Sequence, residues 1–290
     1  MASALIVNPY ATGVTRKLLD RVVAALGDPE VLRTRGRGHA TELTRELAGE
    51  VEAIYVFSGD GGFNEVLNGA DRETPLGFIP GGGTSVLPRA LGLPENAARA
   101  AEQLARGRTR RISVGRVNGR RFGFSAGLGL DAELVRRVEA LGRDEEGTRP
   151  GDAAFAWEAV RALAAHGGRF PTALEVDGYG RFAFALVANC DVYTYVGPLP
   201  LRLAPRARFE LGLDLVAPRE IRMRTLPRLL ASLLRRKGPA GSRGVLYAHD
   251  LDSIRVRCDG NMPLQADGED LGDVSEAHFE AERDAVTVLV

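Results

Sequence analysis

The feature that most constrains the fold is the alternation of short apolar runs with amphipathic stretches from residue 4 to about residue 117. The predicted strands are residues 4–7, 31–34, 53–57 and 76–79, and the predicted helices are residues 15–26, 39–49 and 95–106. Repeated strand–helix units are typical of a parallel sheet covered by helices. Pro94 precedes the last helix, where a proline often stands. We therefore expect an α/β domain over residues 1–117.

The second part of the chain carries hairpin signals instead. Val117-Asn-Gly-Arg120 and Val176-Asp-Gly-Tyr179 place Asn-Gly and Asp-Gly pairs between strand-like residues, a pattern typical of two-residue hairpin turns. The further predicted strands are residues 213–217, 244–248, 253–257 and 285–290, and the predicted helices are residues 132–141, 153–166 and 225–236. Charge and Gly/Pro content predict a mobile loop at 142–152. We expect an antiparallel domain over residues 118–279.

Composition excludes several classes of protein. The chain has 290 residues, a formal net charge of +0 and two widely separated cysteines, Cys190 and Cys258. A neutral chain has no global field that attracts a polyanion, so no nucleic acid partner is expected. Cysteines without CxxC spacing predict neither a zinc site nor a disulfide scaffold, and they fit a reducing cytoplasm. No apolar run approaches membrane-spanning length, so we expect a cytoplasmic protein whose membrane contact is peripheral.

A glycine-rich segment follows the predicted strand at 53–57. Ser58-Gly-Asp-Gly-Gly-Phe-Asn-Glu65 leads into a helical stretch, and a helix N-terminus offers free N–H groups to a phosphate. Glycines at such a turn allow positive φ and the close approach of a ligand. A carboxylate there would repel a bare phosphate, so Asp60 is interpreted as a Mg²⁺ ligand, direct or through water, or as a base for the acceptor hydroxyl. The nucleotide-binding residues predicted here are Ser58, Gly59, Asp60, Gly61, Gly62, Asn64 and Glu65.

A second glycine-rich segment, Pro80-Gly-Gly-Gly-Thr-Ser85, follows the next predicted strand. Ligands of open α/β sheets bind outside the carboxyl ends of the strands, so loops at two neighbouring strand ends predict one phosphate cradle. Either segment alone is more simply a tight turn, but their matching positions favour the cradle. The nucleotide-binding residues predicted here are Gly81, Gly82, Gly83, Thr84 and Ser85. Arg89, in the helical stretch that follows, either reaches a phosphate or lies on a solvated helix face.

Several other segments allow two interpretations. Asn8 and Thr12 follow the first strand and either face the nucleotide or form an ordinary turn. His39 opens a predicted helix and either caps that helix or faces the nucleotide. Gly127-Leu-Gly-Leu-Asp-Ala132 matches the dinucleotide pattern G-x-G-x-x-A but lies among hairpin signals, so backbone packing is favoured over NAD binding. Gln265-Ala-Asp-Gly-Glu-Asp270 by itself predicts a hairpin tip.

Taken together, these segments resemble the diacylglycerol kinase catalytic-domain family, which includes sphingosine kinases and bacterial lipid kinases. The matching segments are Asn8-Pro9, Gly38-His-Ala40, Gly59-Asp-Gly61, Asn64-Glu-Val66, Asn68-Gly69, Pro80-Gly-Gly with Thr84, Arg89-Ala-Leu-Gly-Leu-Pro94, Ala126-Gly-Leu-Gly129 and Asp267-Gly-Glu269. Each is short, and their order and spacing are specific only in combination. The resemblance implies an N-terminal α/β domain similar to those of phosphofructokinase and NAD kinase, and a C-terminal antiparallel β-sandwich that carries the lipid site.

The resemblance also implies an activity. It implies transfer of the γ-phosphoryl group of ATP, with Mg²⁺, to a hydroxyl of a lipid such as diacylglycerol or a sphingoid base. Asp60 would lie beside the phosphates and Glu269 would reach the acceptor hydroxyl, so these are the candidate catalytic residues, and Asp60 remains the alternative base. The candidate metal ligands are Asp60 and Asp267. Residues 280–290 would return to the first domain.

The chain departs from the family at four positions. Gly62 stands where Thr is usual and Ser85 where Asn is usual, while Val86 and Ser113 stand where many members carry aspartate. Loss of a hydroxyl, an amide and two carboxylates thins the expected phosphate and metal shell. An NAD-kinase-like small-molecule kinase, and a catalytically weak or non-catalytic lipid or nucleotide sensor, therefore remain alternatives.

Residues 225–236 predict a basic amphipathic helix. Its leucine stripe consists of Leu226, Leu229, Leu230, Leu233 and Leu234, with arginines around it. Such a helix either lies on anionic lipid or packs on its own domain, and the leucine stripe slightly favours packing. A lipid substrate at a membrane surface is the expected partner. The sequence leaves the oligomeric state open, with a homodimer as one arrangement.

Overall fold

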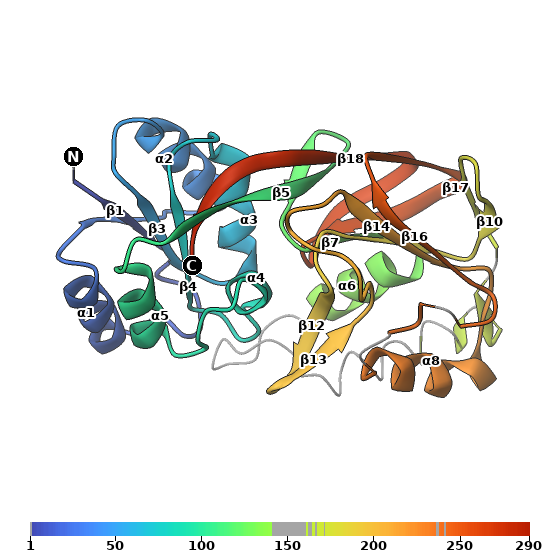
Figure 1. Ribbon diagram of the computed structural model, residues 1–290. Coiled ribbons are helices and arrows are strands. Elements are labelled where there is room, and N and C mark those ends of the chain that lie inside the picture. The colour runs from blue at the N-terminus through green and yellow to red at the C-terminus, as the bar shows by residue number, and fades with distance from the viewer. Residues whose placement is uncertain are drawn as a thin grey trace. The chain divides into compact units, whose positions relative to one another are not determined.

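A computed structural model describes residues 2–140, 161, 164–165, 167–170, 172–235, 238–240 and 242–290 (Figure 1). The chain forms two compact units, which are unit 1 (Met1–Val114 with Arg283–Val290) and unit 2 (Gly115–Glu282). The expected boundary after residue 117 falls at the end of strand β5 (Thr109–Val117). The loop predicted at 142–152, and most of the helix predicted at 153–166, lie outside the described residues.

Unit 1 is an α/β domain, as the alternation of strands and helices predicts. Its strands are β1 (Ala4–Val7), β2 (Glu30–Arg33), β3 (Ile54–Ser58) and β4 (Leu76–Pro80), in the order β4-β3-β1-β2 and all parallel. Its helices are α1 (Arg16–Ala25), α2 (His39–Leu47), α3 (Asp60–Gly69), α4 (Val86–Ala90) and α5 (Ala97–Leu104). The end of β18 (Glu269–Leu289) adds a parallel strand beside β4, where Val288 pairs with Leu76.

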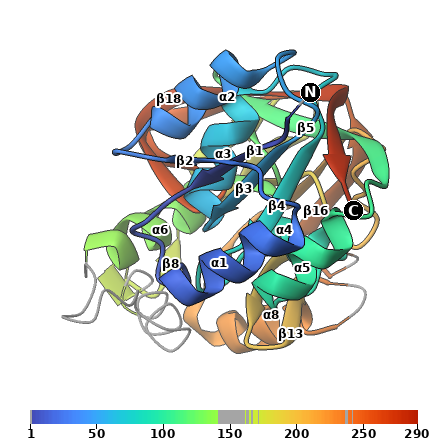
Figure 2. The ribbon, with the colours of Figure 1, turned by 90° about the vertical axis from the view of Figure 1, so that its left-hand side faces the viewer.

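Alternation along the strands divides the core of unit 1 between two faces. Leu5 and Phe57 point to the face that α1 and α5 cover, where they join Val22 and Leu104 in one buried cluster. On α3, the ring of Phe63 meets that of Phe78 edge to face at 5.5 Å, and α3 contacts α2 (Figure 2). Strands β1, β3 and β4 are therefore buried between helices on both faces, which explains why they are largely apolar, whereas the edge strand β2 has exposed charged residues at both ends.

Local side-chain caps mark the starts of two helices of unit 1, α1 and α5. Thr15 accepts the N–H of Leu18 at 3.3 Å at the start of α1. Asn96 accepts the N–H of Arg99 at 3.2 Å and is the N-cap of α5. Pro94 was expected to introduce this helix, but it lies before the cap, because the Asn96 side chain satisfies the first free N–H groups.

Unit 2 is built on an antiparallel sheet in the order β16-β14-β11-β7-β17-β18. The strands of this path, besides β18, are β7 (Ser125–Leu128), β11 (Ala185–Ala188), β14 (Leu213–Pro218), β16 (Val245–Leu251) and β17 (Ser253–Ala266). Beside the path lie β6 (Arg120–Phe122), paired with β5, and β9 (Leu174–Val176) with β10 (Gly180–Phe182). Two small sheets, β12 (Val192–Val196) with β13 (Leu199–Arg202) and β8 (Arg169–Phe170) with β15 (Ile221–Arg222), complete the strands.

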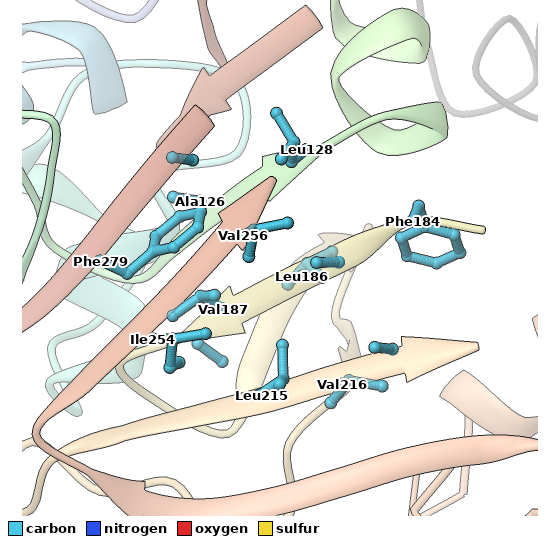
Figure 3. Packing of buried hydrophobic residues seen from close by; sticks show 14 of the residues in the cluster. Ala126, Leu128, Phe184, Leu186, Val187, Leu215, Val216, Ile254, Val256 and Phe279 are labelled. Atoms are coloured by element: carbon cyan, nitrogen blue, oxygen red, sulfur yellow. The ribbon is translucent and has the colours of Figure 1, made fainter. Parts of the chain in front are cut away.

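Helices and a large apolar cluster complete unit 2. The helices within the described part of this unit are α6 (Leu130–Ala140), η1 (Met223–Thr225) and α8 (Leu226–Leu233). Leu186, Leu215, Val256 and Phe279 come from four different strands and pack in one buried cluster (Figure 3). Among the described residues, no helix is long and apolar enough to cross a membrane.

The turns of unit 2 test the hairpin predictions. Val117 pairs with Arg120, and Asn118 and Gly119 have φ values of 47° and 89°, so the predicted two-residue turn is confirmed. The turn predicted at Asp177-Gly178 is wrong in length, because Val176 pairs with Gly180 and three residues form the loop. The strand predicted at 253–257 is part of the longer β17. The pairing register of β17 shifts near Pro263, and this interrupts the alternation of apolar and polar residues, so the sequence pattern did not indicate the full length of the strand.

Candidate phosphate-binding site

Three loops meet at the carboxyl ends of β1, β3 and β4. The Gly13 N–H donates to the Gly81 carbonyl at 2.8 Å, and the Gly81 N–H donates to the Ser58 carbonyl at 2.7 Å. Parallel neighbouring strands deliver their following loops to the same sheet edge, so the two predicted glycine loops lie side by side. The structure thus brings together the residues from which the sequence predicted a single cradle.

The glycines of this cradle are explained by close packing. Their expected positive φ is not found, because Gly59, Gly61, Gly62, Gly81, Gly82 and Gly83 all lie outside the left-handed region. Instead, a Cβ added to Gly82 would stand 2.8 Å from the Gly59 Cα, and one added to Gly81 would stand 3.0 Å from the Ser58 carbonyl oxygen. Backbone packs directly on backbone here, which leaves the loop amides close together without side chains between them.

Gly62 is matched to Ser58 in the same way. A Cβ added to Gly62 would stand 2.8 Å from the Ser58 Cβ and would overlap its hydroxyl oxygen. Ser58 is 2% exposed, and its hydroxyl has no hydrogen-bond partner among the described residues. The departure from the usual threonine therefore has a steric reason in this chain: Ser58 occupies the space that a side chain at position 62 would need.

Asp60 joins the two glycine loops. Its Oδ1 accepts the N–H of Val86 at 2.7 Å and, more weakly, that of Leu87 at 3.5 Å. Asp60 also stands at the first position of α3, where a carboxylate is stabilised by the helix dipole. The carboxylate predicted to serve phosphates and metal thus also holds the second loop against the first.

The other residues of the second loop are partly committed to internal contacts. Ser85 has φ 49° and is 2% exposed, and its hydroxyl bonds within the loop to the N–H of Gly82 at 3.3 Å. Arg89 pairs with Glu95 at 2.5 Å and its side chain is 11% exposed, so it does not lie on a solvated helix face, and the phosphate contact stays a prediction. Gly83 and Thr84 remain as predicted phosphate neighbours, with open space where a Gly83 side chain would point.

Two residues predicted to bind nucleotide serve the packing of α2 on α3. The Glu65 carboxylate accepts the N–H groups of Gly38 at 2.9 Å and Ala40 at 3.1 Å, and so caps α2 from the neighbouring helix. Asn64 is fully buried, and its carbonyl accepts the Asn68 side chain at 2.8 Å. His39 Nδ1 accepts the Arg35 N–H at 3.0 Å, which favours its structural interpretation. These contacts explain the family-like residues at 38–40 and 64–69 by the packing of α2 on α3.

The first loop supports the turn interpretation of Asn8. Its Oδ1 accepts the N–H of Tyr10 at 3.0 Å, which closes an Asx turn after β1. Thr12 is exposed in the same loop. Both residues lie beside the cradle because Gly13 contacts Gly81, but the structure assigns neither a contact of its own toward a ligand.

In unit 2, the predicted catalytic turn is a tight hairpin between β17 and β18. Ala266 pairs with Glu269, and Asp267 and Gly268 both have positive φ, at 50° and 78°. The Asp267 carboxylate is 4% exposed and accepts the N–H groups of Gly123, Phe124 and Ser125 at 2.6, 2.9 and 3.2 Å. Both of its oxygens are used by backbone donors, so this geometry disfavours the predicted metal-ligand role.

Glu269 is positioned differently from Asp267. Its carboxylate pairs with Arg120 at 2.7 Å and its side chain is 14% exposed. The partner comes from β6, so a contact between distant parts of unit 2 orients the predicted base. Sequence reasoning did not find Arg120, because nothing in the sequence near this residue points to position 269.

A buried polar network lies behind this turn and was also missed. Tyr193 donates its hydroxyl hydrogen to Asp131, Gln265 Nε2 donates to Asp131 Oδ2 at 2.6 Å, and the Gly268 N–H donates to Gln265 Oε1 at 2.9 Å. Burial raises the pKa of Asp131, against the lowering effect of its two donors. A Cβ at Gly127 would overlap Asp131, which supports the packing interpretation of the 127–132 pattern.

Among the described residues, no group of three or more His, Cys, Asp or Glu side chains is placed to hold a metal ion. Of the two predicted metal ligands, Asp60 lies at the cradle, and its metal role stays a prediction. The fold is thus an α/β domain with a parallel sheet, followed by an antiparallel sheet domain.

Comparison with known proteins agrees with this class. Residues 2–117 match the family model described as "Diacylglycerol kinase catalytic domain", and residues 125–290 match the model described as "YegS C-terminal NAD kinase beta sandwich-like domain". The chain belongs to the diacylglycerol kinase catalytic-domain family.

Individual relatives are moderately similar. A diacylglycerol kinase of Bacillus subtilis (strain 168) is 29% identical over 240 residues, which is 80% of this chain and 76% of that one. A candidate diacylglycerol kinase from Bacillus anthracis str. Sterne has a solved structure with a TM-score of 0.77 at 24% identity, covering 99% of this chain and 94% of its own. An NAD kinase from Archaeoglobus fulgidus, solved in complex with ATP, has a TM-score of 0.51 at 14% identity, covering 99% and 93%.

Proposed function

We propose that this protein is an ATP-dependent lipid kinase, which transfers the γ-phosphoryl group of ATP to a hydroxyl of diacylglycerol or a related lipid. The observation that carries the proposal is the double glycine loop at the carboxyl ends of β3 and β4, where the Gly59 and Gly82 backbones pack in direct contact. Membership of the diacylglycerol kinase family and the kinase names of its relatives support it.

Phosphate binding is assigned to the backbone of the two loops. Amide N–H groups without intervening side chains form a concave donor site, which suits the diffuse negative charge of a triphosphate. Gly83 and Thr84 belong to the part of the second loop that the internal hydrogen bonds of the loop do not occupy. ATP therefore fits the residues present.

Asp60 is assigned to the metal side of the nucleotide. Mg²⁺, when bound, would neutralise charge on the phosphates during transfer. Asp60 would hold that ion directly or through water, and its Oδ1 would meanwhile keep Val86 and the second loop in place. Asp60 would therefore both hold the second loop in position and balance the charge of the metal ion.

Glu269 is assigned to the lipid hydroxyl. A carboxylate that orients or deprotonates the acceptor must be held still, and Arg120 provides that restraint at 2.7 Å. The turn beneath it is held by Asp267 through three backbone bonds. Asp60 remains the alternative base.

The test is radiolabelled ATP with Mg²⁺, an extracted lipid mixture and, separately, NAD. Label in a lipid supports the proposal and names the acceptor. Label in NAD alone would replace it with a soluble small-molecule kinase, a reading toward which the fold similarity to the NAD kinase points. Binding of ATP without transfer to any acceptor would make the protein a nucleotide sensor.

Two near-isosteric variants separate the assigned roles. Glu269→Gln is expected to leave ATP affinity near normal and to lower lipid turnover by about 10²–10⁴-fold. Asp60→Asn is expected to change both turnover and the Mg²⁺ dependence of ATP binding. Glu276→Gln, an exposed change on the same strand β18, is the matched control and should change neither. Full turnover by Glu269→Gln would remove this residue as the base.

A further inference from the structure

The hairpin of β12 and β13 is set apart from the rest of unit 2. Among the described strands, these two pair with each other and with no third strand. Val192 at its base is 4% exposed, whereas Val196 and Leu199 at its tip are 37% and 56% exposed. Burial therefore falls from base to tip, and the paired tip residues hold their apolar side chains in solvent.

The exposed part of this hairpin carries no charge. The ten residues from Val192 to Leu201 include no Asp, Glu, Lys or Arg, and the flanking Asp191 and Arg202 neutralise each other in an ion pair at the base. Gly197 and Pro198 form the turn between Val196 and Leu199. Exposure of an uncharged apolar tip to water is unfavourable, and this cost is removed when the tip enters an apolar phase.

Gly238, a few residues beyond the end of α8, lies beside the base of this hairpin. A Cβ added to Gly238 would stand 2.9 Å from the Arg202 carbonyl oxygen, and the Gly238 N–H closes a turn on the Arg235 carbonyl at 2.9 Å. Leu234, the C-cap residue of α8, is 59% exposed. Both views place α8 and the hairpin at the same edge of unit 2 (Figures 1 and 2).

The start of α8 adds positive charge to this edge. Arg222 and Arg169 pair with Glu220 at 2.7 and 3.4 Å, and Arg224 also lowers the pKa of that carboxyl group. Three guanidinium groups thus share one carboxylate, and Arg235 is exposed at the other end of the helix. The edge combines apolar tips with a net positive charge.

The geometry points to an anionic lipid bilayer as the partner of this edge, with the β12–β13 tip and Leu234 inserted and Arg224 and Arg235 facing lipid phosphates. A bilayer supplies both the apolar phase and the negative surface that these groups match. Of the leucine stripe predicted at 225–236, the structure describes the side chains of Leu233 and Leu234. Leu233 packs on the core of unit 2, so the exposed contact passes to Leu234 and the hairpin.

This inference rests on the proposed function only in its purpose, which is to bring the enzyme to a lipid acceptor. The binding itself is independent of catalysis. A second copy of the chain is the competing occupant, because apolar tips also pair in dimers. If a second copy were the occupant, the unaltered protein would be a dimer and the variants of the hairpin tip would be monomers.

The test is sedimentation with phosphatidylcholine vesicles, with and without phosphatidylglycerol, using the whole chain. Val196→Ser with Leu199→Ser is expected to weaken binding to anionic vesicles by about tenfold or more, because two partly exposed aliphatic groups lose their insertion. Arg224→Gln and Arg235→Gln are each expected to weaken it about fivefold. Tyr179→Ser, which alters a 37% exposed ring on the β9–β10 turn, is the control and should bind as the unaltered protein does.

Turnover of a dispersed short-chain diacylglycerol separates docking from catalysis. The hairpin variant should keep that turnover and its melting temperature while losing vesicle binding. Binding of this variant equal to that of the unaltered protein, or equal binding to neutral and anionic vesicles, would overturn the docking surface and leave the proposed activity untouched. Anionic binding that depends on the hairpin, in a protein that labels no lipid, would keep the surface and overturn the activity.

Discussion

Gly62 and Ser58 offer a sharp test of how the cradle is built. A methyl group at position 62 would meet the Ser58 Cβ at 2.8 Å and overlap the hydroxyl oxygen. The hydroxyl can rotate away, but the Cβ is fixed by the backbone of β3. Overpacking of this kind typically costs about 1–3 kcal/mol, so Gly62→Ala should lower the free energy of unfolding of unit 1 by that amount.

Rescue should follow the size of the side chain at position 58. Ser58→Ala removes only the hydroxyl, which has no partner among the described residues, and should be nearly neutral by itself. In the Gly62→Ala background it leaves the 2.8 Å contact and should rescue in part. Ser58→Gly removes the contact completely, at a cost of about 0.5–1 kcal/mol for glycine in a strand.

The assay is a double-mutant cycle read by melting temperature and by hydrogen exchange of residues 54–69, which reports on unit 1 even if the chain does not unfold in two states. We expect a coupling energy of about 1–2 kcal/mol between Gly62→Ala and Ser58→Gly. ATP affinity should recover together with stability. Rescue by Ser58→Ala equal to that by Ser58→Gly, or an unperturbed Gly62→Ala, would refute the steric explanation.

Three further predictions concern other contacts. Glu65→Gln should destabilise the start of α2 by about 1–2 kcal/mol, because it leaves one of two backbone N–H groups without an acceptor, and faster hydrogen exchange there would check it. Ser85→Asn should tolerate the φ of 49° and tighten ATP binding by about 0.5–1.5 kcal/mol if its amide donates to the nucleotide, whereas unchanged affinity in calorimetry would contradict that role. Burial raises the pKa of Glu282, but the hydrogen bonds from Arg116 and Arg121 outweigh burial and lower that pKa overall. The ionised Glu282 therefore stabilises the fold above about pH 4.3, and this stabilisation is lost as the pH falls below that value. The difference in the free energy of unfolding between the unaltered protein and Glu282→Gln should accordingly close in acid.

Much of the fold was readable from local patterns. Strands β1, β3 and β4 were predicted because fully buried parallel strands are continuous apolar runs, whose period differs from that of the amphipathic helices between them. The Asn118-Gly119 turn was predicted because few residues other than Asn and Gly adopt two consecutive positive φ values. The presence of two glycine loops at one sheet edge followed from the same order of elements.

Contacts between distant segments were decided by the tertiary structure alone. Residue types at positions 58, 60 and 65 suggested phosphate chemistry, yet Glu65 caps another helix, Asp60 holds the next loop, and Ser58 fills the space beside Gly62. The buried carboxylate of Asp214, which accepts the Tyr247 hydroxyl hydrogen at 2.5 Å, gives no local signal at all. Sequence by itself determined the order of strands, helices and turns, because backbone propensity and apolar periodicity act over a few residues. Only the tertiary structure decided which polar groups meet, because a buried donor must find its acceptor wherever the folded chain brings one within hydrogen-bonding distance.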